Sequence, residues 1–218
     1  MLSIESLYDL SHTLSADYLR QFHYPWEALK GIKEYIVKLG TSLSMEEYDE
    51  VAPQIWVHKT STVSPTAFLG SPCIIGEKTE VRHCAFIRGS ALIGNDCVVG
   101  NSVELKNVIL FDGVQVPHFN YVGDSILGYK AHMGAGSITS NVKSDRSLVV
   151  IHGEEDIPTG IKKVGAMLGD FAEIGCNSVL NPGTVIGRDS IVYPLSCVRG
   201  FVPERSIYKA DGVIVVKK

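Results

Sequence analysis

The chain has 218 residues, of which 45% are hydrophobic and 20% are charged, and its net charge is −4. This composition is typical of a soluble globular protein, and the small negative charge gives no reason to expect a nucleic acid or an anionic membrane as partner. No apolar run approaches the roughly 18 residues of a membrane span, and the first residues do not resemble a secretory signal. The five cysteines form no Cys-x-x-Cys pair, so we expect a reduced, cytoplasmic chain without structural zinc.

Residues 1–52 lack the period that governs the rest of the chain. Apolar residues recur at helical spacing between Trp26 and Leu39, where a proline suits the first turn and a glycine suits the stop. The spacing predicts an amphipathic helix, and two shorter helical pieces are expected near residues 4–10 and 16–22. No catalytic constellation is present here, so we interpret the region as a helical cap on the end of the repeat that follows.

From residue 53 onward, large apolar residues recur at every sixth position. The first ten of these positions keep strict step, and they are Val57, Val63, Leu69, Ile75, Val81, Ile87, Ile93, Val99, Leu105 and Phe111. A hexapeptide period is the signature of a parallel β-helix, in which three hexads form a coil of about 18 residues and coils stack about 4.8 Å apart. The predicted fold is therefore an all-β solenoid with the large apolar side chains inside its prism.

The period slips around a central segment and is interrupted further on. Between Phe111 and Leu127 two of the three steps shorten from six residues to five, and His118 lies between them. Irregularities in a rigid scaffold are often functional, so we expect chemistry there. Residues 141–163 carry no hexad and predict a hairpin-like excursion from the prism. The predicted domains are a helical cap, a β-helix and a C-terminal tail, at residues 1–52, 53–203 and 204–218.

Two basic residues near this slip suggest an anion site. Arg88 and Lys106 lie 18 residues apart, which is one full coil, and each directly follows an apolar hexad position. Both side chains should therefore point outward and stack about 5 Å apart. Two cations held this way repel each other unless an anion lies between them, which makes a phosphate site physically reasonable. We expect the slip to turn His118, an imidazole suited to proton transfer near neutral pH, towards the same anion.

Three sequence blocks resemble a known enzyme domain. They are Asn-Ser-Val-Glu-Leu-Lys at 101–106, His-Phe-Asn-Tyr-Val-Gly-Asp-Ser at 118–125 and Gly-Ala-Gly-Ser-Ile-Thr-Ser-Asn at 134–141. In order and spacing they resemble the acetyltransferase domain of the bifunctional N-acetylglucosamine-1-phosphate uridyltransferase/glucosamine-1-phosphate acetyltransferase family, and the related archaeal sugar-phosphate enzymes. The resemblance implies a left-handed β-helix, acetyl-CoA as co-substrate, an amino-sugar phosphate or nucleotide sugar as acceptor, and a cytoplasmic homotrimer in UDP-N-acetylglucosamine biosynthesis.

The resemblance also implies roles for individual residues. His118 matches the general base that takes the proton from the sugar amine, and Arg88 and Lys106 match the pair that binds the sugar phosphate. The residues that match the sugar pocket or the strand supporting it are Asn101, Glu104, Tyr121 and Asn141. His132 stands where the family has another pocket asparagine, and both a substrate contact and an interface position are open for it. The residues expected to contact coenzyme A are Cys176, Pro194 and Lys209, and no metal ligand is expected.

The chain departs from the family pattern at several positions. Val142 stands where the family has a tyrosine, Ser147 where it has a phosphate-binding lysine, and Asp211 near the place of an arginine that contacts coenzyme A. Residues 1–50 are too short for the uridyltransferase domain. These departures leave a non-catalytic, sugar-nucleotide-binding trimer open as an alternative.

A γ-type carbonic anhydrase is a further alternative, because such enzymes are hexapeptide-repeat trimers with three zinc-binding histidines. That site needs a close pair of histidines, whereas His83, His118 and His132 lie 35 and 14 residues apart. Asp124 follows a glycine at a corner of the repeat, and we expect it to cap the backbone.

Overall fold

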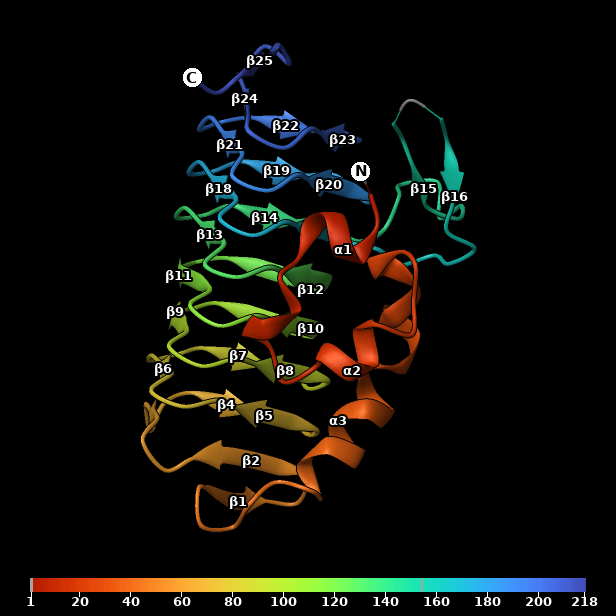
Figure 1. The fold of residues 1–218 in the computed structure, drawn as a ribbon. Helices are drawn as coiled ribbons and strands as arrows, with labels where there is room; N and C mark the ends of the chain where they lie inside the picture. The colour runs from red at the N-terminus through yellow and green to blue at the C-terminus, as the bar shows by residue number, and fades with distance from the viewer. Residues whose placement is uncertain (1, 154) are drawn as a thin grey trace.

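The computed structural model describes residues 2–153 and 155–218 of the chain. Its main body is a stack of parallel coils that rises in chain order, with the N-terminal helices along one side and a hairpin projecting near the upper coils (Figure 1). The hexapeptide β-helix, the helical N-terminal region and the hairpin-like excursion predicted from the sequence are confirmed. Among the described residues, no helix is long and apolar enough to cross a membrane.

Three stacks of short parallel strands form the faces of the prism, and two longer strands run across a corner. The long strands are β10 (Glu104–Leu110) and β12 (Tyr121–Leu127), which begin on face 1 and end on face 2. Face 1 also contains β4 (Phe68–Leu69), β7 (Phe86–Ile87), β14 (Ile138–Thr139), β19 (Val179–Leu180) and β22 (Cys197–Val198). Face 2 also contains β2 (Ile55–His58), β5 (Cys73–Ile75), β8 (Ala91–Ile93), β17 (Ala166–Leu168), β20 (Thr184–Ile186) and β23 (Phe201–Val202).

Face 3 and the two antiparallel strands at the ends complete the prism. Face 3 contains β3 (Thr62–Val63), β6 (Glu80–Val81), β9 (Val98–Asn101), β11 (Gln115–His118), β13 (His132–Met133), β18 (Glu173–Ile174), β21 (Ile191–Val192) and β24 (Ser206–Tyr208). β1 (Tyr48–Ala52) pairs antiparallel with β2, and β25 (Ile214–Val216) pairs antiparallel with β24. The last coil thus reaches Tyr208, inside the segment predicted as a tail. The division into three domains stays a prediction.

The register places the slip in the period one step earlier than the sequence predicts. Leu110, not Phe111, pairs with Ile93 below it and Leu127 above it, so Leu110 occupies the interior stack. The shortened steps therefore fall between Leu105 and Leu110 and again between Val122 and Leu127. Phe111 lies outside the interior stack, and its ring packs instead against Tyr8 of the N-terminal segment at a centroid distance of 5.1 Å.

The N-terminal segment lies along face 2 of the prism, whereas the sequence predicts a cap on one end. Its helices are α1 (Ile4–Leu7), η1 (Leu10–His12), α2 (Ala16–Leu19), η2 (Pro25–Gly31) and α3 (Ile32–Gly40). Helix α3 packs on β5, β8 and β10, and η2 packs on β12. The long helix predicted from Trp26 to Leu39 is present as η2 followed by α3.

The outward side chains of face 2 explain this position. Side chains alternate between the two sides of a strand, so the middle residue of each face 2 strand points away from the prism interior. These residues are apolar, pair with one another in register and are fully or almost fully buried: Ile74, Leu92, Ile109, Ile126, Met167 and Val185. Burying a side chain of this size stabilises the fold by about 1.5–3 kcal/mol, so face 2 favours an apolar cover.

The excursion between the fifth and sixth coils is an antiparallel hairpin. β15 (Val150–Ile151) pairs with β16 (Ile157–Pro158), and Val142 forms an antiparallel bridge with Lys163 at its base. Residue 154, which falls between these two strands in sequence, lies outside the described residues. The excursion leaves the prism after Thr139 of face 1 and returns before Ala166 of face 2. It therefore starts at the corner between faces 1 and 2.

Candidate functional site

The corner between faces 1 and 2 concentrates the irregularities of the fold. The two coils shortened by one residue are shortened here, at Lys106 and Asn107 in one coil and at Gly123 and Asp124 in the next. The hairpin leaves the prism at the same corner in the coil above, directly after Asn141. The slip in the period therefore lies beside Lys106 and Asp124, and not beside His118 as the sequence predicts.

Asp124 joins side chains from three coils at this corner. Its side chain is 4% exposed and accepts hydrogen bonds from Lys106 Nζ at 2.8 and 3.0 Å. Asn107 Nδ2 donates to one of its oxygens at 2.9 Å, and Asn141 Nδ2 donates to the other. The predicted backbone-capping role of Asp124 is wrong, because its carboxylate binds side chains and not backbone amides. The spacings of 17 and 18 residues to these partners equal one coil, which is the signal that could have identified the group.

Arg88 and Lys106 stack in adjacent coils, as their 18-residue spacing predicts. Ile87 pairs with Leu105, so the two basic residues that follow them are neighbours along the corner. Each cation already has an internal carboxylate: Arg88 Nη1 lies 2.8 Å from Glu104 Oε1, and Lys106 binds Asp124. The repulsion that we expected an external anion to offset is therefore offset within the protein. The Arg88–Glu104 pair is 46% and 35% exposed, so a phosphate can approach the guanidinium from solvent.

Tyr121 lies on face 1 beside this cluster. It pairs with Glu104 on one side and with Ile138 on the other, and its hydroxyl accepts a hydrogen bond of 3.2 Å from Asn141 Nδ2. Burial raises the pKa of Tyr121, and the negative charges of Asp124 and Glu104 raise it further. The phenol is therefore neutral and can donate a hydrogen bond to a bound anion. Of the predicted site residues, the structure brings together Arg88, Glu104, Lys106, Tyr121 and Asn141.

His118 lies at a different corner, between faces 3 and 1. It ends β11 and pairs with Asn101, while β12 begins three residues later at Tyr121. Its side chain is exposed, and the imidazole has no hydrogen-bond partner in the described part of the chain. The turn is fixed through the backbone, because His118 N–H donates to the buried Asn120 Oδ1 at 3.2 Å. The expectation that the slip turns His118 into the Lys106 cluster is wrong, because about 10 Å of strand, from Tyr121 to Asp124, separates the two corners.

The residues predicted to contact coenzyme A share the corner of His118. The register continues upward from face 3, so that one residue per coil follows the strand at this edge. These edge residues are His83, Asn101, His118, Ala135, Cys176 and Pro194, and Lys209 follows β24 at the same edge in the last coil. Asn101 therefore lies beside His118 and not in the Lys106 cluster. The structure thus aligns His118 with Cys176 and Pro194 along one edge, and Lys209 precedes the corresponding position of the last coil by one residue.

His132 takes a separate position on face 3. Its Nδ1 lies 2.8 Å from Glu173 Oε2, in the strand stacked above it. This contact lies outside the Lys106 cluster, so His132 does not join the other predicted sugar-pocket residues. Within the described parts of the chain, no three His, Cys, Asp or Glu side chains are grouped as metal ligands.

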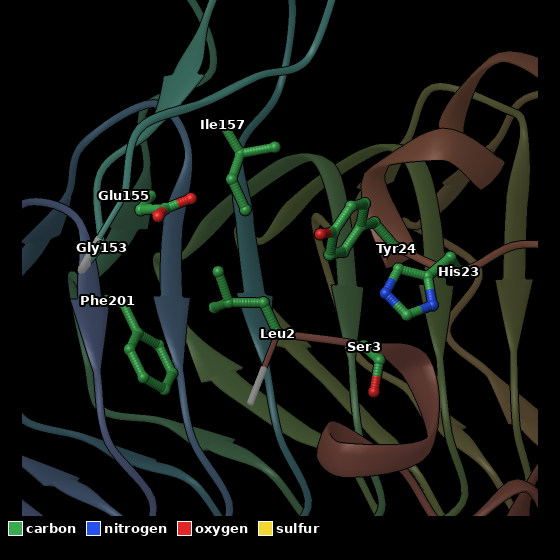
Figure 2. Close-up of a pocket in the computed structure, with 8 residues that line it drawn as sticks. All are labelled: Leu2, Ser3, His23, Tyr24, Gly153, Glu155, Ile157 and Phe201. Atoms are coloured by element: carbon green, nitrogen blue, oxygen red, sulfur yellow. The ribbon is translucent and has the colours of Figure 1, made fainter.

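A separate hollow lies where the first residues of the chain meet the hairpin. Its volume is about 300 Å³, and Figure 2 shows Leu2, Ser3, His23 and Tyr24 facing Gly153, Glu155, Ile157 and Phe201. Its ionisable side chains are those of His23, Tyr24 and Glu155. None of the residues predicted for acetyl transfer lines this hollow, so it lies apart from the candidate site.

Several known proteins are similar to the chain. The C-terminal domain of GMPPB matches residues 72–156. The bifunctional protein GlmU of Methanococcus maripaludis strain S2 is 27% identical over 205 residues, which cover 92% of this chain and 50% of that protein. The bifunctional sugar-1-phosphate nucleotidylyltransferase/acetyltransferase of Sulfurisphaera tokodaii is 30% identical over 105 residues, which cover 48% of this chain and 26% of that protein. The chain spans about half the length of the first of these relatives.

Solved structures with a similar fold include sugar acetyltransferases. The H141N mutant of perosamine N-acetyltransferase from Caulobacter crescentus, in complex with CoA and GDP-perosamine, has a TM-score of 0.37 and 17% identity, and covers 73% of this chain and 55% of that one. The polySia-specific acetyltransferase NeuO has a TM-score of 0.49 and 14% identity, and covers 74% and 85%. The resemblance to bifunctional nucleotidylyltransferase/acetyltransferase proteins, predicted from three sequence blocks, is confirmed by the relatives.

Proposed function

We propose that the chain is an acetyl-CoA-dependent N-acetyltransferase whose acceptor is an amino sugar linked to a phosphate or to a nucleotide. One observation carries the proposal. Face 1 has the cations Arg88 and Lys106 at one edge and the exposed imidazole of His118, which has no partner among the described residues, at the other, with Tyr121 between them. A relative named as a bifunctional nucleotidylyltransferase/acetyltransferase supports acetyl transfer. The described residues form a β-helix with a helical flank.

The proposed reaction is a direct transfer from the thioester to the amine. His118 takes a proton from the ammonium, and the free lone pair of the amine attacks the thioester carbonyl. The C–N bond forms and the C–S bond breaks. The acylated nitrogen loses its second proton to solvent, and the imidazolium returns its proton to the departing thiolate. An acyl-cysteine intermediate is not needed, because Cys176 lies two coils from His118 and therefore about 10 Å away.

The phosphate end of the acceptor would meet Arg88 before Lys106. The Arg88–Glu104 pair is exposed, and exposed ion pairs stabilise a fold only weakly, so it opens at low cost. Lys106 is held by a buried carboxylate that has other donors, so it stays in place and presents its remaining N–H groups. Tyr121 adds a neutral hydroxyl donor on the same face. Positioning of this kind supports transfer without covalent chemistry.

We also propose that the chain works as a homotrimer with sites in the grooves between prisms. Face 2 is covered by the N-terminal helices, so faces 1 and 3 are available to neighbouring prisms. Face 1 exposes the rings of Phe68 and Phe86, which contact each other with centroids 5.6 Å apart. Light scattering should give about three times the 23.7 kDa of one chain. A monomer would contradict this assembly.

The assay for the proposed activity is thiol release from acetyl-CoA in the presence of glucosamine-1-phosphate or another amino-sugar phosphate. We expect His118→Ala to lower the rate by about 10²–10⁴-fold, the usual contribution of a general base. His83→Ala is the matched control, because His83 is an exposed histidine at the same edge two coils away. Activity that does not depend on His118 would contradict the proposal. Tight sugar-phosphate binding without coenzyme A binding would instead support a non-catalytic trimer.

A further inference from the structure

An open recess of about 530 Å³ adjoins the Lys106 cluster on the side of the N-terminal helices. Its lining comes from η2 and α3, from β10 and the corner above it, and from the returning arm of the hairpin. The charged residues that line it are five lysines and two carboxylates: Lys30, Lys33, Lys106, Lys162, Lys163, Glu34 and Asp124. The recess is thus strongly basic in a chain whose net charge is −4.

Four of these lysines lack an internal partner. Lys30, Lys33, Lys162 and Lys163 are exposed, and none forms an ion pair within the part of the chain that the structure describes. Elsewhere the exposed Lys59 and Lys78 and the half-buried Lys143 and Lys217 each have a carboxylate partner. The four unpaired lysines come from two segments separated by more than 120 residues of sequence, so the fold brings them together. Like charges gathered around a recess favour a multiply charged anion.

We propose that this recess binds the diphosphate of a nucleoside diphosphate amino sugar, which is then the acceptor class of the enzyme. The proposal rests on the proposed function and makes the substrate more specific. Glu104 and Asp124 already offset the charges of Arg88 and Lys106, whereas the recess adds four lysines that form no ion pair within the described chain. Its volume lies in the range of small-molecule sites and exceeds that of a single phosphate group. Ser90 and Asn107 supply polar side chains for hydroxyl groups in the same lining.

The direct test is calorimetric titration of the whole chain with inorganic pyrophosphate and with inorganic phosphate. We expect pyrophosphate to bind about tenfold more tightly than phosphate, and the double variant K30Q/K33Q to lose this preference. Lys38→Gln is the matched control, because Lys38 is an exposed lysine of α3 outside the recess. Equal affinity for the two anions, or an unchanged preference in K30Q/K33Q, would overturn the proposal.

A second measurement links the recess to the acceptor. In the thiol-release assay, K30Q/K33Q should raise the KM for UDP-glucosamine about tenfold more than the KM for glucosamine-1-phosphate. An equal effect on both acceptors would overturn the assignment. If neither acceptor supports thiol release in the wild type, the proposed function fails, while the pyrophosphate titration still decides whether the recess binds a diphosphate.

Discussion

Replacing Asp124 by asparagine tests how the corner between faces 1 and 2 is held together. The carboxylate is 4% exposed and accepts from Lys106 on two contacts and from Asn107 and Asn141 on one each. The asparagine side chain keeps the shape of the aspartate, but its amide nitrogen cannot accept a hydrogen bond. The donors to one of the two carboxylate oxygens therefore lose their acceptor, and Lys106 loses its counterion. A hydrogen bond to a charged group contributes about 1.5–3 kcal/mol, so we expect the free energy of unfolding to fall by about 3 kcal/mol.

The measurement is urea unfolding followed by circular dichroism, with Asp96→Asn as the control. Asp96 has the same left-handed corner conformation, with φ of 53° against 49° for Asp124, but its side chain is exposed. The control should stay within about 0.5 kcal/mol of the wild type, as most surface substitutions do. If the two variants were equally stable, the side-chain network around Asp124 would not hold the corner.

Three further predictions follow from other contacts. In the thiol-release assay, Arg88→Gln should raise the KM for the acceptor and leave kcat within about threefold. The control Arg82→Gln, on face 3, should leave the KM unchanged, and a fall in kcat alone for Arg88→Gln would contradict a binding role. Burial raises the pKa of Asp170 above its ordinary value, so the folded wild type binds more protons than the unfolded chain and loses stability as the pH rises above about 4. Asp170→Asn should therefore gain in Tm relative to the wild type as the pH rises, and a difference independent of pH would refute this. Gly40→Ala should lower the Tm in calorimetry, because the added Cβ meets the Trp56 ring. Overpacking costs about 1–3 kcal/mol, whereas the higher helix propensity of alanine contributes roughly 1 kcal/mol. A stabilised variant would contradict this packing.

The hexapeptide period predicts the prism but not its cover. The interior stack is readable because each apolar side chain repeats at a fixed local spacing, as Ile75 and Ile93 do. The outward residues Ile74 and Leu92 are also apolar, yet each stands directly before an interior residue and reads as part of one buried strand. Their spacing of one coil was the available sign that a second layer covers face 2. Which segment forms that layer depends on tertiary packing, which periodicity does not contain.

The sequence predicted several residues of the candidate site, but it did not predict how they are arranged. Arg88 and Lys106 follow face 1 hexads one coil apart, so their stacking could be predicted from spacing alone. His118 follows a hexad of face 3, and this difference of one face separates it from the cations. The importance of Asp124 was missed because its partners are distant in sequence and close only through coil stacking.

The cover on face 2 has a consequence for how the chain is made. Asp9 N–H donates to Asp170 Oδ2 at 2.7 Å, a contact that spans 161 residues of sequence. At about 5–20 residues per second, a ribosome needs about 8–30 s to travel that far. Each new coil can pair with the coil before it as soon as it emerges from the ribosome. The N-terminal helices, in contrast, cannot pack until the face 2 strands that they cover have been synthesised. The N-terminal helices are therefore synthesised before the coils that they cover, but they pack only after those coils have formed.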